Sequence, residues 1–191
     1  MINVDLSHVT SLQQFYDDII AGQAETHGED YHEQHDAVRR HLQPGDTYME
    51  LGTHQGSTAS RAMLNNPEKV ILVDISMEKY NKFLKPIAED YCSQNNIELI
   101  VHECSSIDAK CAHKTDILLI DSLHQRNHMQ KELDLHGNNV SKYIIVHDTS
   151  IINGRANESL YHCLMEFAKT NGWEEIERGT DNVGYTVIRK K

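Results

Sequence analysis

The chain has 191 residues and a formal net charge of −11, from 29 acidic and 18 basic residues. This length favours one domain with room for a substantial core. The negative charge and the scattered basic residues argue against nucleic acids and anionic membranes as partners, and no apolar run is long enough to span a bilayer. The four cysteines form no C-x-x-C pair and no signal-peptide pattern is present, which predicts a reduced, cytoplasmic protein that acts on small molecules.

Residues 1–45 precede the first predicted strand, and we interpret them as an N-terminal extension. Helical spacing of apolar side chains predicts a helix over residues 11–20 and a second over residues 32–42, joined by a polar loop at 22–30. The segment His32-Glu33-Gln34-His35 lacks the H-E-x-x-H spacing of a zinc site, so we favour a solvated helix face there. Position alone predicts that this extension is a lid or an acceptor-binding region.

From residue 46 to residue 191 strand and helix patterns alternate, and we treat this part as one domain. Apolar runs predict strands over residues 47–51, 69–74, 97–102, 116–121, 142–147, 173–178 and 183–189. Helices are predicted over residues 57–65, 77–94, 125–138 and 156–171. Pro86 is expected to bend or split the second of these helices.

This alternation predicts an α/β fold, with a Rossmann-like, mostly parallel sheet of seven strands and helices on both faces. The last two strands are joined only by Gly179-Thr180-Asp181-Asn182, a composition typical of a hairpin turn. One strand of this C-terminal hairpin must therefore run antiparallel to the rest.

The turn after the first strand, at residues 48–58, is the most informative stretch. Its spacing is E-x-G-x-x-x-G, with Glu50, Gly52 and Gly56, and it differs from the G-x-G-x-x-G of dinucleotide-binding folds. Gly52 allows a sharp turn and the close approach of a ligand, and the helix start that follows favours polar or anionic groups. Asp74 ends the next strand about twenty residues later, where such folds place an acid on ribose hydroxyls; the alternative is a helix cap.

Polar side chains also follow the fourth and fifth predicted strands. Asp121 ends the fourth, and His147 and Asp148 end the fifth, so all three are expected at the same edge of the sheet. Carboxylate and imidazole ligands suit a divalent first-row metal ion; the alternative is that the carboxylates cap the segments that follow. His124 is a candidate general base, because imidazole titrates near neutral pH; the alternative is an exposed side chain at a helix start.

Together these motifs resemble the class I S-adenosylmethionine-dependent methyltransferases. Within that class, D-x-x-H after the fourth strand and H-D after the fifth look like the small O-methyltransferases of the macrocin O-methyltransferase and cephalosporin-hydroxylase-like group, with catechol O-methyltransferase as a more distant relative. The resemblance covers residues 46–190 and fits the antiparallel closing strand. It implies methyl transfer from S-adenosylmethionine to a hydroxyl group of a small acceptor.

The resemblance also implies roles for individual residues. The methionine part of the cofactor would lie against Glu50 and Gly52, the ribose against Asp74, and the adenine beside Ser105 and Ser106. The full set implied for the cofactor is Glu50, Gly52, Thr53, His54, Gly56, Ser57, Asp74, Ile75, Ser105, Ser106 and Asp121.

The same resemblance places Asp121, His147 and Asp148 around a divalent ion and makes Asp121 and His124 the catalytic pair, with His124 as the base. His147 brings a nitrogen where catechol-type enzymes present oxygen ligands. Magnesium, manganese, iron and zinc are therefore all candidates, as is a site that uses no metal.

Two other functions stay open on the sequence. A nicotinamide-dependent oxidoreductase of a related fold is disfavoured by the missing G-x-G-x-x-G motif. A cofactor-binding protein without turnover is disfavoured by the intact set of Asp121, His124 and Asp148. The sequence identifies neither the acceptor nor the oligomeric state, and a homo-oligomer is compatible with it.

Overall fold

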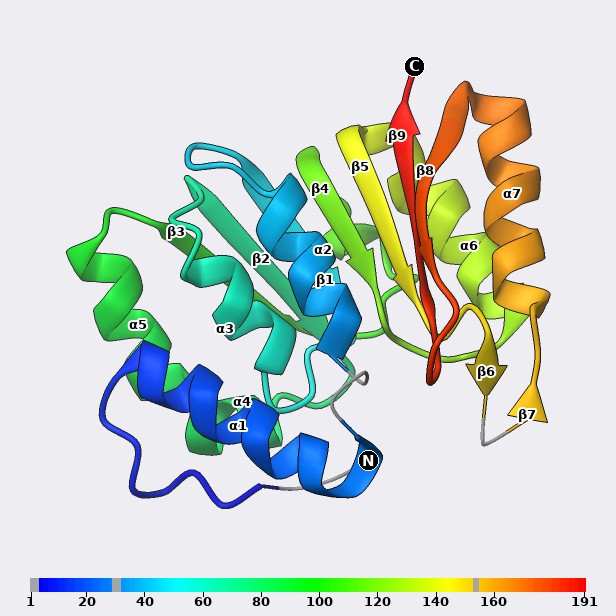
Figure 1. Ribbon diagram of the computed structural model, residues 1–191. Coiled ribbons are helices and arrows are strands. Elements are labelled where there is room, and N and C mark those ends of the chain that lie inside the picture. The colour runs from blue at the N-terminus through cyan, green and yellow to red at the C-terminus, as the bar shows by residue number, and fades with distance from the viewer. Residues whose placement is uncertain (1–3, 29–31, 153–154) are drawn as a thin grey trace.

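The computed structural model describes residues 4–28, 32–152 and 155–191, and it shows a central sheet with helices on both faces (Figure 1). The strand order is β3-β2-β1-β4-β5-β9-β8. Strand β9 pairs antiparallel with β5 and β8, whereas the pairs from β3 to β5 are parallel, which confirms the predicted Rossmann-like sheet. The strands are β1 (Thr47–Leu51), β2 (Lys69–Asp74), β3 (Glu98–Glu103), β4 (Thr115–Ile120), β5 (Val140–His147), β8 (Trp173–Gly179) and β9 (Tyr185–Lys190).

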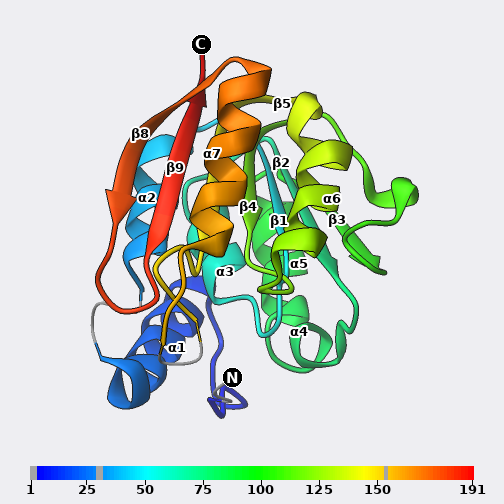
Figure 2. The same ribbon diagram turned by 90° about the vertical axis from the view of Figure 1, so that its right-hand side faces the viewer.

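The helices fall into two groups on opposite sides of the sheet, as the edge-on view in Figure 2 shows. The predicted long second helix of the core is split at Leu84, and Pro86 lies in the first turn of its second half, where a missing N–H costs nothing. One group is α1 (Leu12–His27), α2 (Glu33–His41), α3 (Ser57–Met63), α4 (Glu78–Phe83) and α5 (Lys85–Gln94); the other is α6 (Arg126–His136) and α7 (Ser159–Asn171).

Short elements complete the chain, and the sequence patterns did not predict them. Two-residue strands β6 (Ile151–Ile152) and β7 (Arg155–Ala156) pair as a small antiparallel ribbon after β5. Single 3₁₀ turns, η2 (Ala109–Cys111) and η3 (Gly137–Asn139), precede β4 and β5. None of the helices in the described ranges is long and apolar enough to cross a membrane.

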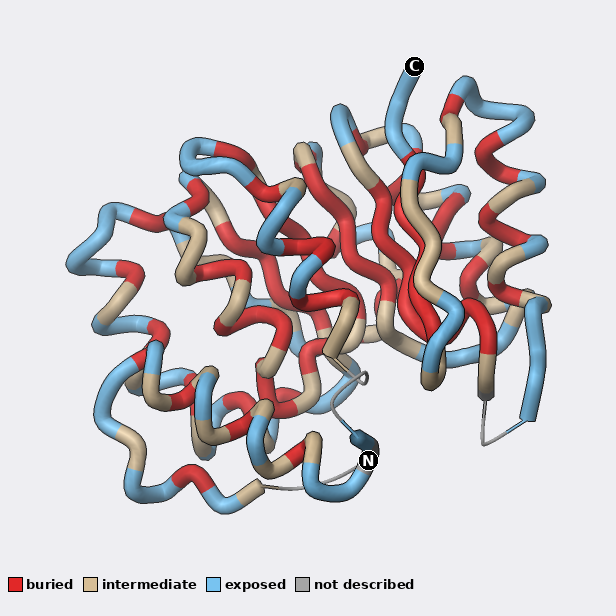
Figure 3. The backbone as a smooth tube through the Cα atoms, in the orientation of Figure 1, coloured by how far each residue is buried: buried red, intermediate tan, exposed pale blue. Residues whose placement is uncertain are grey.

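Strand alternation divides the interior into two cores. Tyr48, Leu72 and Ile117 point to the face covered by α1–α5, and their neighbours Met49, Ile71 and Leu118 point to the face covered by α6 and α7. The central strands are consequently buried along nearly their whole length (Figure 3). This burial on both faces explains why these strands are continuous apolar runs in the sequence.

The N-terminal extension differs from its prediction in the length of its first helix. Helix α1 begins at a cap made by Ser11, whose side chain accepts a hydrogen bond from the backbone N–H of Gln14, and it continues to His27. The loop predicted at 22–30 is therefore wrong for residues 22–27, while residues 29 and 30 lie outside the described part. Gly22 lies inside the helix at a point where Val4 packs closely. A Cβ at position 22 would lie 2.8 Å from the methyl groups of Val4, so glycine makes this packing possible.

The solvated face predicted for the second helix is also wrong. Gln34 and His35 of α2 are buried, together with Ala37 and Val38. This side of α2 packs on α3, β5 and β9, so its polar residues are enclosed by the fold. The extension as a whole contributes to the core beneath α1–α5 and is not a separately packed unit.

This shared core makes the N-terminal extension a testable part of domain stability. Phe15 of α1 is fully buried in the same cluster as Tyr48 of β1. Phe15→Ala should therefore lower the free energy of unfolding of the whole chain by about 3–5 kcal/mol, in a single transition on a urea titration. The control, Glu25→Ala, lies on the exposed side of the same helix and should change it by less than about 0.5 kcal/mol. Separate melting of α1 would contradict this prediction.

Candidate active site

The predicted site residues gather at the carboxyl ends of the parallel strands. Glu50, Asp74, Asp121 and His147 each follow by two positions a strand side chain of the core beneath α1–α5. Because side chains alternate with a period of two, all four side chains are directed to the sheet face that the N-terminal helices cover. The topology thus brings together residues that are almost 100 positions apart in the sequence.

Position 52 must be a glycine because the backbone of Asp121 packs directly against it. Its N–H donates to the carbonyl of Val73, and the N–H of Asp121 donates to the carbonyl of Leu51, each at 2.8 Å. Gly52 has φ +94°, and a Cβ there would lie 2.0 Å from the carbonyl oxygen of Asp121. We expected a ligand to make this close approach; the structure shows that the loop carrying Asp121 makes it.

Glu50 lies at the base of this turn and is buried. The hydroxyl of Tyr48 donates a 2.6 Å hydrogen bond to its Oε2 atom. Burial raises the pKa of Glu50 well above its ordinary value, and the charges of Asp121 and Asp74 add to the increase. Three acidic groups therefore share a small region, which favours a cationic ligand. The Oγ1 atom of Thr53, in the same turn, is buried and has no hydrogen-bond partner among the described residues.

Asp74 orders the glycine turn from the neighbouring strand. Its Oδ2 atom accepts a 2.7 Å hydrogen bond from the backbone N–H of His54, and its Oδ1 atom accepts one from Ser76 at 3.1 Å. Helix α4 begins only at Glu78, after Met77, so the helix-cap alternative for Asp74 is wrong. Ile75, which follows, is 79% exposed, an apolar side chain open to contact by a flat ligand.

The side chain of His54 contacts helix α4. Its Nε2 atom lies 2.7 Å from the ammonium nitrogen of Lys79, a residue that the sequence analysis did not single out. Burial lowers the pKa of His54, and the positive charge of Lys79 lowers it further. The imidazole is therefore neutral and accepts the hydrogen bond.

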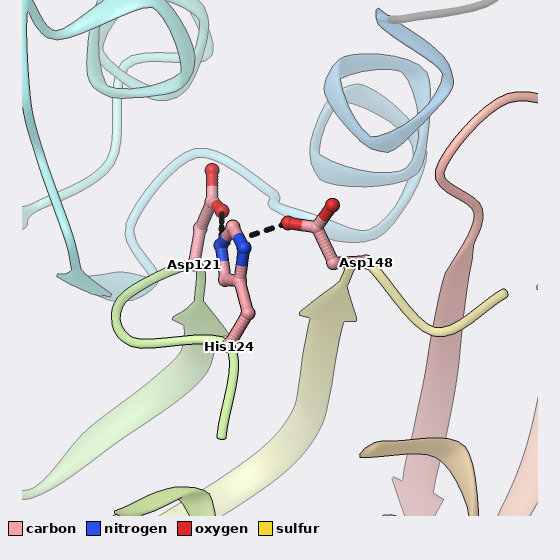
Figure 4. Close-up of side chains that lie close together, drawn as sticks. All are labelled: Asp121, His124 and Asp148. Carbon is pink, nitrogen blue, oxygen red and sulfur yellow. Dashed lines mark ion pairs between the residues drawn. The ribbon is translucent and has the colours of Figure 1, made fainter. Parts of the chain in front are cut away.

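Asp121, His124 and Asp148 converge where β4 and β5 end (Figure 4), and the imidazole of His147 contacts the same two carboxylates. The Nε2 atom of His124 lies 2.9 Å from Oδ2 of Asp148 and 3.5 Å from Oδ1 of Asp121. The Nδ1 atom of His147 lies 3.1 Å from the same oxygen of Asp121 and 3.3 Å from that of Asp148. Asp148 has a left-handed backbone, with φ 57°, which is uncommon outside glycine and typical of functional sites.

The donor atoms of this cluster fit a divalent cation. One atom each from Asp121, His124 and Asp148 lie within 4.8 Å of one another, a mixed carboxylate and imidazole set. His124 thereby joins the possible ligands, whereas the sequence analysis assigned the imidazole ligand to His147. Both imidazoles face the same two carboxylates, so either can complete the set.

The charges of this cluster change the expected chemistry of His124. Hydrogen bonds with Asp121 and Asp148 raise the pKa of His124 to about 10. For His147 burial opposes protonation, but the same two carboxylates prevail and raise its pKa to about 10. The expectation that His124 titrates near neutrality is therefore wrong for the ion-free cluster. A cation between the carboxylates would lower the pKa again, because it competes with the proton for their charge.

Sequence reasoning missed the partners that hold the site in place. Tyr48 precedes Glu50 by two residues, so strand periodicity alone would have placed the two side chains on one face. The hydroxyl of Ser106, which is predicted to lie beside the adenine, is 2.9 Å from Nε2 of His128 on α6. That contact joins elements with no recognisable motif, and no sequence signal marks it.

A family model described as rhamnosyl O-methyltransferase/CmcI matches residues 34–172, well over half of the chain. Together, the sheet order and this match define a class I S-adenosylmethionine-dependent methyltransferase. The chain belongs to the rhamnosyl O-methyltransferase/CmcI family, which replaces the oxidoreductase and non-catalytic alternatives. No curated protein sequence matches the chain.

Solved structures share the fold at low sequence identity. The N-methyltransferase NodS from Bradyrhizobium japonicum WM9, in complex with S-adenosylhomocysteine, has a TM-score of 0.62 over 94% of this chain and 96% of its own, at 13% identity. Magnesium protoporphyrin IX methyltransferase from Synechocystis PCC 6803, with bound S-adenosylmethionine, has a TM-score of 0.60 over 94% and 79%, at 15% identity. These similarities establish the fold of the chain.

The packing of Gly52 gives a prediction with a matched control. Gly52→Ala should abolish binding of S-adenosylhomocysteine in calorimetry, because the new Cβ must displace the Asp121 loop. Gly45 has a similar φ of +89°, but a Cβ there meets nothing within 4 Å. Gly45→Ala should therefore cost only the backbone strain, about 1–2 kcal/mol of stability, and leave binding intact. Equal binding by the two variants would contradict the role of this contact.

The raised histidine pKa values predict how stability depends on pH. An unfolded histidine titrates near 6.5, so the extra stability is complete below that pH and is lost as pH rises towards 10. The free energy of unfolding of chelator-treated protein should fall over this range in urea titrations. His124→Gln should flatten the decline, whereas His162→Gln, at an exposed histidine, should not. If the free energy of unfolding declined with pH at the same slope in both variants, the decline could not be assigned to His124.

Proposed function

We propose that the protein transfers the methyl group of S-adenosylmethionine to a hydroxyl of a small acceptor, with a divalent ion at the Asp121, His124, His147 and Asp148 cluster. The observation that carries the proposal is the convergence of these four side chains directly beside the glycine turn, where the Asp121 backbone packs on Gly52. The turn proposed for the cofactor and the loop that begins at Asp121 are thus in direct contact. Methyl transfer requires such closeness, because acceptor and donor must be held in line.

The residues of the glycine turn fit the cofactor. The acidic group around Glu50 suits the positive charges of its amino and sulfonium groups, and the unpartnered Thr53 hydroxyl offers a further hydrogen bond. Asp74 retains lone pairs for the ribose hydroxyls beyond its bonds to the turn, and Ile75 offers an apolar surface to the adenine. When bound, S-adenosylmethionine supplies an electrophilic methyl group.

The cluster fits an acceptor hydroxyl. A divalent ion, when bound, lowers the pKa of a hydroxyl that it contacts. Asp121 and Asp148 hold the ion, and His147 holds the two carboxylates in place from its buried position. His124 is 40% exposed, and with an ion held by the carboxylates its Nε2 atom would be free to accept the hydroxyl proton.

The N-terminal helices act as a lid over the acceptor. They are fixed to the cofactor turn at two points: Gln55 exchanges hydrogen bonds with the backbone of Val4, and Thr58 pairs with Nε2 of His35 at 3.1 Å. Helix α2 covers the sheet face to which the catalytic side chains point. The family name includes rhamnosyl O-methyltransferase, so sugar hydroxyls are the first acceptors to test. The four cysteines are free and buried, which is compatible with the expected cytoplasmic location.

The test is a methyl-transfer assay on a panel of sugar and phenolic hydroxyl compounds, followed as S-adenosylhomocysteine released. Chelator treatment should lower the rate, and manganese should restore it at least as well as magnesium, given the imidazole ligands. His124→Ala should cut turnover by about 10²–10⁴ with little change in S-adenosylhomocysteine affinity. Asp148→Ala should weaken manganese binding without unfolding the domain.

The control is His162→Ala, which should leave both turnover and affinity unchanged. A rate indifferent to chelator would remove the metal from the proposal. Turnover by His124→Ala equal to that of the wild type would assign proton removal to another group. If the wild-type chain binds no S-adenosylmethionine, the proposed function is wrong.

A further inference from the structure

Helix α6 carries a line of polar side chains towards the sheet. His128, Glu132 and His136 are spaced by four residues and therefore lie one above another on the same face of the helix. Glu132 and His136 are buried, at 0% and 1% exposure, between the apolar side chains Met129 and Leu133. A carboxyl group inside an apolar core lowers stability unless its partners compensate.

The partners of this line lie on two loops of the proposed cofactor site. The hydroxyl of Ser122 donates a 2.5 Å hydrogen bond to Oε1 of Glu132. The same oxygen lies 3.4 Å from Nε2 of His128, which in turn lies 2.9 Å from the hydroxyl of Ser106. The Nε2 atom of His136 donates to the Ser106 carbonyl at 2.7 Å. Ser106 follows β3, and Ser122 directly follows Asp121 after β4, so one helix holds both loops.

Two polar atoms of this line lower the stability of the core, because they are buried without a hydrogen bond in the part of the chain that the structure describes. The Oε2 atom of Glu132 and the Nδ1 atom of His136 are buried without a hydrogen-bond partner among the described residues. A buried network that is only partly satisfied is less stable than an apolar core of the same shape. Burial also raises the pKa of Glu132, against the hydrogen bonds with Ser106 and Ser122. Core stability therefore does not account for Glu132.

We propose that Glu132 is a positioning residue for cofactor binding, which fixes the loops of Ser106 and Ser122 at the separation that the adenosyl group requires. The inference rests on the proposed function, because the family resemblance in the sequence is what places Ser106 beside the adenine of a bound cofactor. Glu132 holds Ser122 by a direct hydrogen bond, and it holds Ser106 through His128, which contacts both Glu132 and Ser106. It also fixes the start of the loop that leads from Asp121 to His124.

The experiment measures S-adenosylhomocysteine affinity by calorimetry on the full chain, with thermal melting in parallel. Glu132→Leu should weaken binding about tenfold or more, the effect of one lost hydrogen bond to a charged group, while the melting temperature stays the same or rises. Glu132→Gln keeps an acceptor for the Ser122 hydroxyl and should restore most of the affinity. Asp134→Asn, at an exposed carboxylate on the same helix that accepts a hydrogen bond from Gln130, is the matched control and should bind as the wild type.

A second comparison tests the path through Ser122. Ser122→Ala should weaken binding in the wild type but have no further effect in Glu132→Leu, because the two side chains act as one unit. Additive losses, or Glu132→Leu binding equal to the wild type, would overturn the proposal. A loss of affinity that matches a fall in melting temperature would assign Glu132 a merely structural role and overturn it as well. A wild-type chain that binds no S-adenosylhomocysteine would instead overturn the proposed function.

Discussion

The contact on which the rest of the site depends is the backbone of Asp121 against Gly52. With no side chain at position 52, the loop after β4 crosses the turn after β1 at a distance that any Cβ would block. Hydrogen bonds from Gly52 to Val73 and from Asp121 to Leu51 hold the crossing on both sides. The cofactor turn and the Asp–His cluster are therefore one rigid unit, and a change at either is transmitted to the other.

Charge is the second constraint. Asp74, Asp121 and Asp148 concentrate negative charge at the strand ends, and burial close to Asp121 and Asp74 raises the pKa of Glu50. In the ion-free protein the two histidines compensate by carrying protons, which makes the cluster stable and leaves His124 in the wrong form for a base. A bound cation would offset the negative charge of the carboxylates and would also leave His124 without its proton. The same electrostatics thus favours a sulfonium cofactor and a divalent ion.

Around this unit lie two supporting layers. On one face α1 and α2 share the main core, and the N-terminal extension contacts Gln55 of the glycine turn and Thr58 of α3 through Val4 and His35. On the other face α6 presents Glu132 and its histidine neighbours to the loops after β3 and β4. In the proposed function the first layer lies over the acceptor, and the second supports the loops that would hold the cofactor.

The sequence by itself determined the fold class, the positions of the seven strands to within two residues, and most of the residues proposed for the site. Buried parallel strands are continuous apolar runs, and Glu50, Asp74, Asp121 and Asp148 end such runs. Only the tertiary structure decided the burial of His35, the partner of Gly52, the raised pKa of His124 and the contacts of α6 with the loops after β3 and β4. Burial, close packing and pKa are set by neighbours distant in sequence, such as Thr58 for His35 and Asp148 for His124, and local pattern contains no information about them.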